Sequence, residues 1–425
     1  MNSNLRIISI ALMALLFVGS GVYLFYRSAP EQAMNQAVVS LNYQDLNEDT
    51  RAQIQETQNK ISQAETAEEI QGLNLDLAIL LLQAARETPD DSFLKAAESS
   101  AQDLPESERN YILAELSILN HNFVQAENLS QKELVINPDN QLFLATLADA
   151  QIEQGKNDAA AETLQKLSNI KPDFAALTRI AYWRELNGDR VGAIEAMEQS
   201  LDFSGLFDEN RAWALTETGR LWYPLNPSVG LDYFKEAQNI DPSFALAFAY
   251  EAIDALGKSD FTNAETIAKK AYTLKPTTLN AYVLAAALNA QQKIDSAQVK
   301  IAQAQLLLQF SNDPIEKLYF ANLFPDLNED KNIQAEVTLK NLYEGRSTAF
   351  IADTVAQAFL LKGNLELAEF YTVKALETGI EDPLIWTHAL AVFKATEKNQ
   401  AAENLQQDLE ALFPGFVNLE DYLKF

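Results

Sequence analysis

The chain of 425 residues has no cysteine and only two histidines, His121 and His388. It therefore forms no disulfide and offers neither a thiolate nucleophile nor a cysteine-ligated zinc site. We expect His121 in a turn between helices and His388 in a helix near the end of the chain. With no second histidine nearby, neither predicts a metal centre or a Ser–His nucleophile system. The sequence thus predicts a protein without a cofactor or metal, and not an enzyme.

Basic residues are also scarce, with 32 Lys and Arg against 60 Asp and Glu, which gives a net charge of −28. A body this acidic repels phosphate backbones and anionic lipid, so nucleic acid is not expected as a partner. The charge would attract a partner rich in Lys or Arg, although solubility alone also explains it. No small-molecule substrate is indicated.

The 13 prolines are few but regularly placed. Pro138 and Pro172 are 34 residues apart, and Pro242 and Pro276 repeat that spacing. Each proline closes a segment with two apolar stripes of helical period, and no strand-like alternation persists over more than a few residues. A unit of this length predicts an all-α solenoid of stacked helix pairs, in which each pair packs only against its neighbours.

These units resemble the tetratricopeptide repeat, with small residues at repeat positions 8 and 20, a Gly-like turn near 15 and Pro at 32. The match covers roughly 73–310 and 346–415, with residues 73–105 as a degenerate first unit. The resemblance implies a right-handed α-solenoid. Residues that carry it include Ala114, Ala126, Ala148, Ala160, Ala181, Ala193, Gly230, Ala252, Ala264, Ala285, Ala297, Ala356, Ala368 and Trp386.

Domain boundaries follow from where this pattern begins and fails. Residues 31–72 form a polar connector that is expected to be partly helical, and 73–310 form the main solenoid. Residues 311–347 fit no unit and are interpreted as an irregular helical insertion, while 348–425 return to the repeat and end in a cap. A turn-rich Trp-Tyr-Pro-Leu-Asn-Pro element within 205–227 also departs from the pattern.

The N-terminal segment, residues 1–30, contains a run without charge from Ile7 to Tyr26, flanked by Arg6 and Arg27. Twenty residues of helix cover the hydrocarbon core of a bilayer, so we predict one N-terminal transmembrane helix. A cleaved signal peptide ending near Gly19-Ser20-Gly21 is the alternative, although the apolar run continues beyond that point. In either case the solenoid is expected on the far side of a bacterial inner membrane, in the periplasm.

The resemblance also implies a concave face, because ligand contacts in tetratricopeptide repeats cluster on one face of each first helix. The Lys and Asn of the carboxylate-clamp variants are absent, so chaperone C-terminal tails are not expected to bind. An acidic and aromatic lining instead suits an extended or helical peptide with basic and apolar residues. Transferring the family's contact positions gives Tyr111, Glu115, Asp149, Glu153, Tyr182, Glu185, Trp222, Tyr223, Tyr282 and Asn289.

Two motifs receive a structural interpretation. Gly257-Lys258-Ser259 resembles the end of a phosphate-binding loop, but Ala252 occupies the place of its first glycine and the surroundings are helical. Asp326, Asn328 and Asp330 have the spacing of a calcium loop without its glycine or its glutamate, and Asp45-Asn47-Asp49 repeats that spacing. We interpret these as an interhelix turn and as loop or capping carboxylates.

The sequence therefore predicts a membrane-anchored adaptor for assembly or biogenesis of a bacterial envelope complex. Three alternatives stay open: an exported binding protein released by signal cleavage, a non-catalytic subunit of a secretion, polysaccharide or cytochrome maturation system, and an enzyme with its site in 311–347. If the lining is exposed, replacing Tyr182 and Trp222 together by alanine should weaken partner capture while leaving the fold intact.

Overall fold

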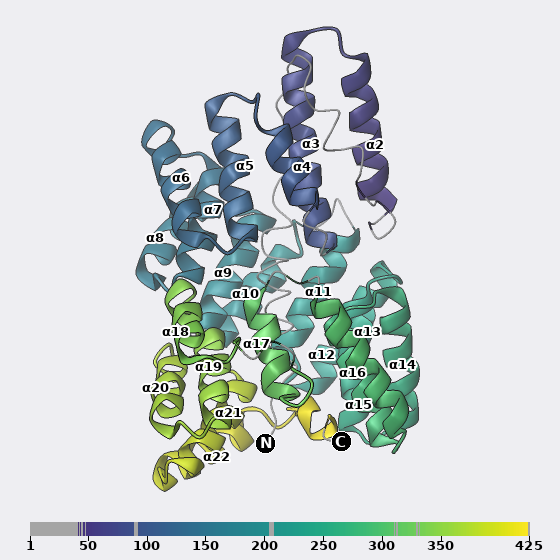
Figure 1. Ribbon diagram of the computed structural model, residues 1–425, viewed down its shortest axis with the longest axis vertical. Coiled ribbons are helices and arrows are strands. Elements are labelled where there is room, and N and C mark those ends of the chain that lie inside the picture. The colour runs from purple at the N-terminus through teal and green to yellow at the C-terminus, as the bar shows by residue number, and fades with distance from the viewer. Residues whose placement is uncertain are drawn as a thin grey trace. The chain divides into compact units, whose positions relative to one another are not determined.

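The computed structural model describes residues 41, 43, 46, 48–88, 92–203, 208–309, 311, 313–328, 330 and 332–423. Over these residues every regular element is a helix, as the ribbon in Figure 1 shows. The all-α prediction is therefore confirmed for this part of the chain. The predicted transmembrane segment, 7–26, lies outside the described residues. Of the helices within them, none combines the length and the apolar content that a bilayer crossing requires.

The chain divides after Lys171 into two compact units, and each is described by itself. In the N-terminal unit, α2 packs on α3, and the helices from α3 onward form three hairpins. The connector predicted to be partly helical contains α2. The helices of this unit are α2 (Glu48–Gln63), α3 (Ala67–Glu87), α4 (Ser92–Ser100), α5 (Glu106–Leu119), α6 (Phe123–Ile136), α7 (Gln141–Glu153) and α8 (Asn157–Ile170).

The C-terminal unit begins at Pro172 and contains six hairpins, with two single helices, α17 and α18, between the fourth and the fifth. Its elements are α9 (Phe174–Leu186), α10 (Arg190–Ser200), α11 (Asp208–Trp222), α12 (Pro227–Ile240), α13 (Ala245–Gly257), α14 (Phe261–Leu274), α15 (Thr278–Ala290), α16 (Ile294–Leu308), α17 (Pro314–Leu323), α18 (Glu336–Gly345), α19 (Ala349–Leu361), α20 (Leu365–Leu376), α21 (Pro383–Ala395), α22 (Asn399–Leu412) and the 3₁₀ helix η2 (Leu419–Tyr422).

The repeated prolines end the second helix of a hairpin. Pro138, Pro172, Pro242 and Pro276 each lie two residues beyond the last residue of α6, α8, α12 and α14. A proline there cannot continue the helix, because it lacks the backbone N–H and its ring clashes with the preceding turn. Many helices begin with an Asn, Asp or Thr whose side chain accepts a backbone N–H, such as Asp173 at α9.

The turns inside the hairpins share one backbone feature. Seven of them place one residue at positive φ: Gly155, Gly188 and Gly363, and the non-glycine residues His121, Ser259, Gln292 and Glu397. This left-handed conformation reverses the chain after the first helix, and glycine adopts it without steric cost. The prediction of a Gly-like turn is thus correct in geometry, although a glycine occupies it in fewer than half of these turns.

Small residues lie where the two helices of a hairpin cross. Ala148 of α7 and Ala160 of α8 are buried, and the corresponding alanines of the other hairpins are buried in the same way. In the α11–α12 hairpin two glycines replace them, because a Cβ on Gly219 would lie 2.8 Å from the carbonyl oxygen of Gly230. Gly219 and Gly230 are one residue closer to each other in the sequence than Ala148 and Ala160 are. The departure predicted within 205–227 is therefore a shortened turn.

The segment that fits no repeat, 311–347, contains α17 and α18, which both pack against α19. Two buried contacts hold its ends. The Arg346 guanidinium lies 3.3 Å from the Asp313 carboxylate, and Ser311 donates a 2.7 Å hydrogen bond to Glu316. Asp313 also caps α17 by accepting the backbone N–H of Ile315. The Asp313–Arg346 ion pair thus joins the start of the segment to its end.

Candidate interaction surface

Nine of the ten residues predicted to line a partner-binding face lie on the first helices of their hairpins, and Tyr223 directly follows α11, but most of the ten are not exposed. Trp222 and Asn289 are half-buried. The other eight are buried, and Tyr282 is 0% exposed. As placed, those eight side chains are not available to a partner without rearrangement. Their role in partner contact stays a prediction, and the residues buried are Tyr111, Glu115, Asp149, Glu153, Tyr182, Glu185, Tyr223 and Tyr282.

In the N-terminal unit the predicted residue Glu115 joins neighbouring hairpins. Its carboxylate lies 2.7 Å from Nη2 of Arg86 on α3 and accepts a 2.6 Å hydrogen bond from Oγ1 of Thr146 on α7. All three side chains are largely buried. The ring of Tyr111 packs edge-on against that of Phe143, with centroids 5.9 Å apart. These contacts position one hairpin against the next, which is a structural role.

In the C-terminal unit Glu185 belongs to a buried charge cluster with Glu217 and Arg220. Arg220 donates two 2.7 Å hydrogen bonds to the two oxygens of Glu185 and a third, also 2.7 Å, to Oε2 of Glu217. Such bidentate pairing is the strongest geometry available to an arginine. Burial raises the pKa of the Glu217 carboxyl, and the Arg220 charge opposes that effect. The cluster joins α9 to α11.

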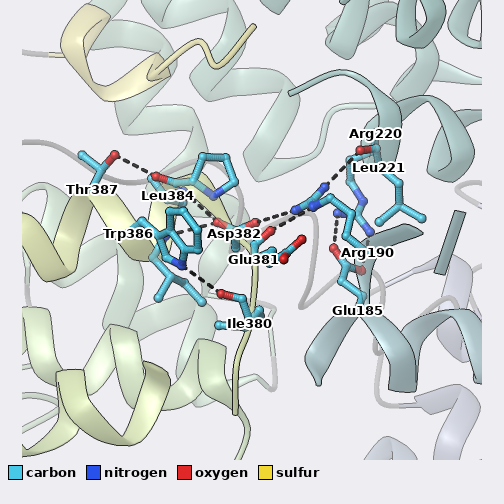
Figure 2. Close-up of polar contacts among 12 residues, drawn as sticks. Glu185, Arg190, Arg220, Leu221, Ile380, Glu381, Asp382, Leu384, Trp386 and Thr387 are labelled. Carbon is cyan, nitrogen blue, oxygen red and sulfur yellow. Dashed lines mark hydrogen bonds and ion pairs between the residues drawn. The ribbon is translucent and has the colours of Figure 1, made fainter. Parts of the chain in front are cut away.

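Arg190, at the start of α10, extends this polar region to a segment almost 200 residues later. Its Nε donates a 2.9 Å hydrogen bond to the carbonyl of Glu381, and its Nη1 donates a 3.0 Å hydrogen bond to that of Leu221. Its Nη2 lies 3.7 Å from Oδ2 of Asp382, an ion-pair distance without a hydrogen bond. Figure 2 shows Arg190 between the α11 side and the start of α21. We call this contact the arginine clamp.

The arginine clamp is accompanied by a close approach of two turns. A Cβ on Gly188 would lie 2.2 Å from the carbonyl oxygen of Gly379, and both glycines have positive φ. The Arg190 guanidinium also lies 5.5 Å from the centre of the Phe413 ring. The first and last hairpins of the C-terminal unit are therefore in direct contact, so its stack of repeats closes on itself.

A second long-range contact is made by residues 413–423, which we call the C-terminal strap. The backbone N–H of Gly415 donates to the carbonyl of Pro224, and the Asn289 amide donates a 2.9 Å hydrogen bond to the carbonyl of Tyr422. The Tyr422 hydroxyl donates a 3.1 Å hydrogen bond to the carbonyl of Leu256. Leu419 and Leu423 are buried in the main core of the unit. The strap thus lies on the α11–α12 turn, α13 and α15.

The remaining predicted residues Trp222 and Tyr223 lie at the end of α11. The Trp222 indole N–H donates a 3.0 Å hydrogen bond to Glu198, which also accepts one of 2.8 Å from Tyr233. The Tyr223 hydroxyl donates a 3.1 Å hydrogen bond to Asp254 of α13. Tyr282 packs against Phe324, with ring centroids 5.9 Å apart. Only Trp222 of the predicted aromatic residues keeps substantial exposure.

A family model for the tetratricopeptide repeat matches residues 117–180. Its span contains the α5–α6 turn, the whole α7–α8 hairpin and the first part of α9. Over these residues the chain matches the tetratricopeptide-repeat family. The family is one of protein–protein interaction scaffolds, and its fold is generally not catalytic.

Three solved structures are similar to this chain at low identity, with TM-scores below 0.5. A crystal structure of MamA protein is 14% identical, covering 48% of this chain and 92% of that one, with a TM-score of 0.29. The Cut9–Hcn1 hetero-tetramer of the APC/C is 12% identical, covering 75% and 63%, with a TM-score of 0.41. The C-terminal part of a repeat-containing protein from Cytophaga hutchinsonii is 14% identical, covering 65% and 98%, with a TM-score of 0.37. The comparison with curated proteins gives no significant match.

Both histidines lie where the sequence predicts them. His121 is in the α5–α6 turn with φ 56°, and its ring lies 5.8 Å from that of Phe123. His388 is buried on α21, where Nδ1 is hydrogen-bonded to the carboxylate of Asp353 on α19. Burial raises the pKa of Asp353, and the nearby His388 opposes that effect. This pair joins two hairpins, and no pattern in the sequence indicates it.

The motifs with a structural interpretation are also accounted for. Lys258 caps α13 and forms a 2.7 Å ion pair with Asp254, while Ser259 supplies the positive φ of the turn. In the acidic loop, the Asn328 carboxamide accepts the N–H of Asp330, and the Asp330 carboxylate accepts that of Asn332. Across the part of the chain that the structure describes, no group of acidic or histidine side chains is arranged to hold a metal ion.

Proposed function

We propose that this protein is a scaffold that binds a polypeptide partner rich in basic and apolar residues. The observation that carries the proposal is the repeat architecture itself, in which neighbouring helix hairpins bury their apolar faces against one another. The net charge of −28 supports a basic partner, because unlike charges speed association and fix orientation. We propose no catalytic role.

The partner's first contacts are proposed at Trp222 and Asn289, the two predicted residues that retain exposure. A half-buried tryptophan supplies a large apolar area, which is typical of binding hot spots, and the hydrogen bond from its N–H to Glu198 holds the ring in place. The eight buried residues of the predicted lining would then act indirectly, by positioning the helices that form the face. They position helices through contacts such as the one between Glu185 and Arg220.

The experiment that tests this proposal is photo-crosslinking in cells. A photoreactive amino acid replaces Trp222, and a matched control replaces Val135, which is 83% exposed on α6. We expect a discrete crosslinked protein at position 222 that is weak or absent at 135 and that declines as salt is raised, because exposed charges are screened. Identical products from both positions, or none from either, would contradict the proposal.

The second part of the proposal concerns location. We propose that residues 7–26 anchor the protein in a bacterial inner membrane, with the repeats in the periplasm as part of an envelope assembly. The uncharged run between Arg6 and Arg27 supports an anchor. Membrane fractionation with N-terminal sequencing should find an intact N-terminus in the membrane pellet. A mature N-terminus near residue 20 in the supernatant would instead indicate a released binding protein.

A further inference from the structure

We propose that the C-terminal strap occupies a docking surface for an apolar segment of the partner, and that the partner binds there by displacing it. The surface is formed by the α11–α12 turn, the end of α13 and the end of α15. The inference rests on the proposed scaffold function and names where and how that function is controlled. The strap would then lower the affinity for any partner until it is released.

The contacts between the strap and this surface are of the kind used in peptide recognition. Asn289 donates to a backbone carbonyl of the strap, at Tyr422, and the carbonyl of Pro224 accepts a backbone N–H, at Gly415. Both bonds use main-chain atoms of the strap, so a peptide of different sequence can form them. Main-chain hydrogen bonds combined with a few side-chain sites are a recurrent mode of peptide binding.

The side-chain sites define the chemistry of the expected partner. Val417 lies directly over Gly257 at the end of α13, and the Tyr422 ring packs edge-on against Phe261, with centroids 6.2 Å apart. Leu419 and Leu423 are buried beneath them. The surface therefore fits a segment that carries three aliphatic side chains and one aromatic ring and that ends in a 3₁₀ turn.

An independent observation points to the same surface. The contact positions of the repeat family select Asn289 and Tyr223 without reference to the strap. Asn289 holds the strap by a hydrogen bond, and the carbonyl oxygen of Tyr223 lies 2.8 Å from where a Cβ on Gly415 would stand. Two of the ten predicted contact positions therefore touch the strap.

The first test locks the strap in place. An added Cβ at Gly257 would lie 3.6 Å from Cβ of Val417, within the separation that disulfides use. The chain has no cysteine of its own, so Gly257→Cys with Val417→Cys creates a single, reversible bond. Each single cysteine variant serves as a control for the substitution itself.

The second test releases the strap. In Gly415→Val the new side chain would lie 2.2 Å from Pro227 and 2.8 Å from the Tyr223 carbonyl, neither of which can move aside easily. Gly345→Val is the matched control, because a Cβ there meets nothing within 4 Å. Circular dichroism and melting establish that each variant is folded.

The probe is a fluorescein-labelled synthetic peptide with the sequence of residues 413–423, added to the full chain and followed by anisotropy. We expect Gly415→Val to bind it at least tenfold more tightly than the unchanged protein and the Gly345→Val control. The oxidised cysteine pair should bind none, and reduction should restore the original affinity. Equal binding by the locked and reduced forms, or no binding by a folded released form, would overturn the proposal.

If Gly415→Val does not fold, hydrogen exchange in the unchanged protein still tests the proposal. Amides of 416–423 in the unchanged protein should exchange well before those of α13 and α15, because displacement is a local opening. Exchange of the strap only together with those helices would show a permanent cap and refute the proposal. Crosslinking at Trp222 distinguishes failure of the strap proposal from failure of the scaffold function. A partner captured equally by the locked and reduced forms would reject control by the strap alone. Capture of no partner at all would reject the scaffold function.

Discussion

The N-terminal and C-terminal units are built from the same hairpin but differ in how far their buried polar contacts reach. In the N-terminal unit, Glu115 binds Arg86 and Thr146, which are 29 and 31 residues away, so each bond joins neighbouring hairpins. In the C-terminal unit, Arg190 and Glu381 are 191 residues apart, and Tyr422 and Leu256 are 166 apart. The first unit is an open stack and the second is a closed one.

This difference predicts different cooperativity. In an open stack each hairpin is stabilised only by its neighbours, so the ends can unfold without the middle. A closed stack has no free end, because the arginine clamp and the C-terminal strap join its last elements to earlier ones. We therefore expect the C-terminal unit to unfold as a block and the N-terminal unit to fray.

The largest effect is expected from breaking the arginine clamp with Arg190→Ala. This change leaves Asp382 buried opposite an empty space, and breaking a buried ion pair in this way typically costs about 3–5 kcal/mol. Hydrogen exchange should show lost protection in α21 and α22, with the helices of the N-terminal unit unaffected.

The double variant Arg190→Met with Asp382→Asn controls for charge, because Asn can still cap α21. The double variant should recover most of the stability that Arg190→Ala loses. An Arg190→Ala variant whose α21 and α22 exchange as in the unchanged protein would show that the clamp does not hold the unit closed.

The next effect compares a buried ring, that of Tyr182, with a half-buried one, that of Trp222. Tyr182 on α9 is 4% exposed, so Tyr182→Ala should lower the free energy of unfolding by about 3 kcal/mol, as a large-to-small core substitution does. Trp222→Ala, at the half-buried ring, should cost clearly less. Chemical denaturation measures both. Unchanged stability in Tyr182→Ala would support the prediction from sequence that this ring lines an open face.

The repeat pattern explains what could be predicted from sequence and what could not. Alanines such as Ala148 and the closing prolines repeat at a fixed spacing, so the hairpins and their ends follow from the sequence. The family's contact positions could be transferred, but their burial depends on which side chains fill the interior, and Tyr282 is covered by Phe324 from the irregular segment. Arg190, Asp382 and the strap meet only because the stack closes, and no periodic signal encodes that contact.

A smaller effect should appear in the pH dependence of the buried cluster. Burial raises the pKa of Glu217 above its value in the unfolded chain, so the folded protein binds a proton there more readily. The stability from this group is present below the unfolded pKa and is lost as the pH rises through the folded pKa.

Glu217→Gln removes this titration while keeping an oxygen for Arg220. We expect the variant to become more stable relative to the unchanged protein as the pH rises from the ordinary carboxyl range through the raised pKa of Glu217. Melting temperatures across that range measure the gain, with Glu209→Gln, exposed on the same helix, as the control. A difference that stays constant with pH would contradict the assignment.

The smallest effect compares equivalent turns of the two units. Gly155 in the α7–α8 turn has φ 68°, and Ser259 in the α13–α14 turn has φ 59°. A left-handed residue with a Cβ costs about 1 kcal/mol, so Ser259→Gly should stabilise and Gly155→Ala should destabilise by that amount or less. Because the closed unit unfolds as a block, Ser259→Gly should raise its whole transition, whereas Gly155→Ala should increase exchange mainly in α7 and α8. If the effects of the two substitutions on hydrogen exchange extend equally far through their units, the contrast between open and closed stacks is wrong.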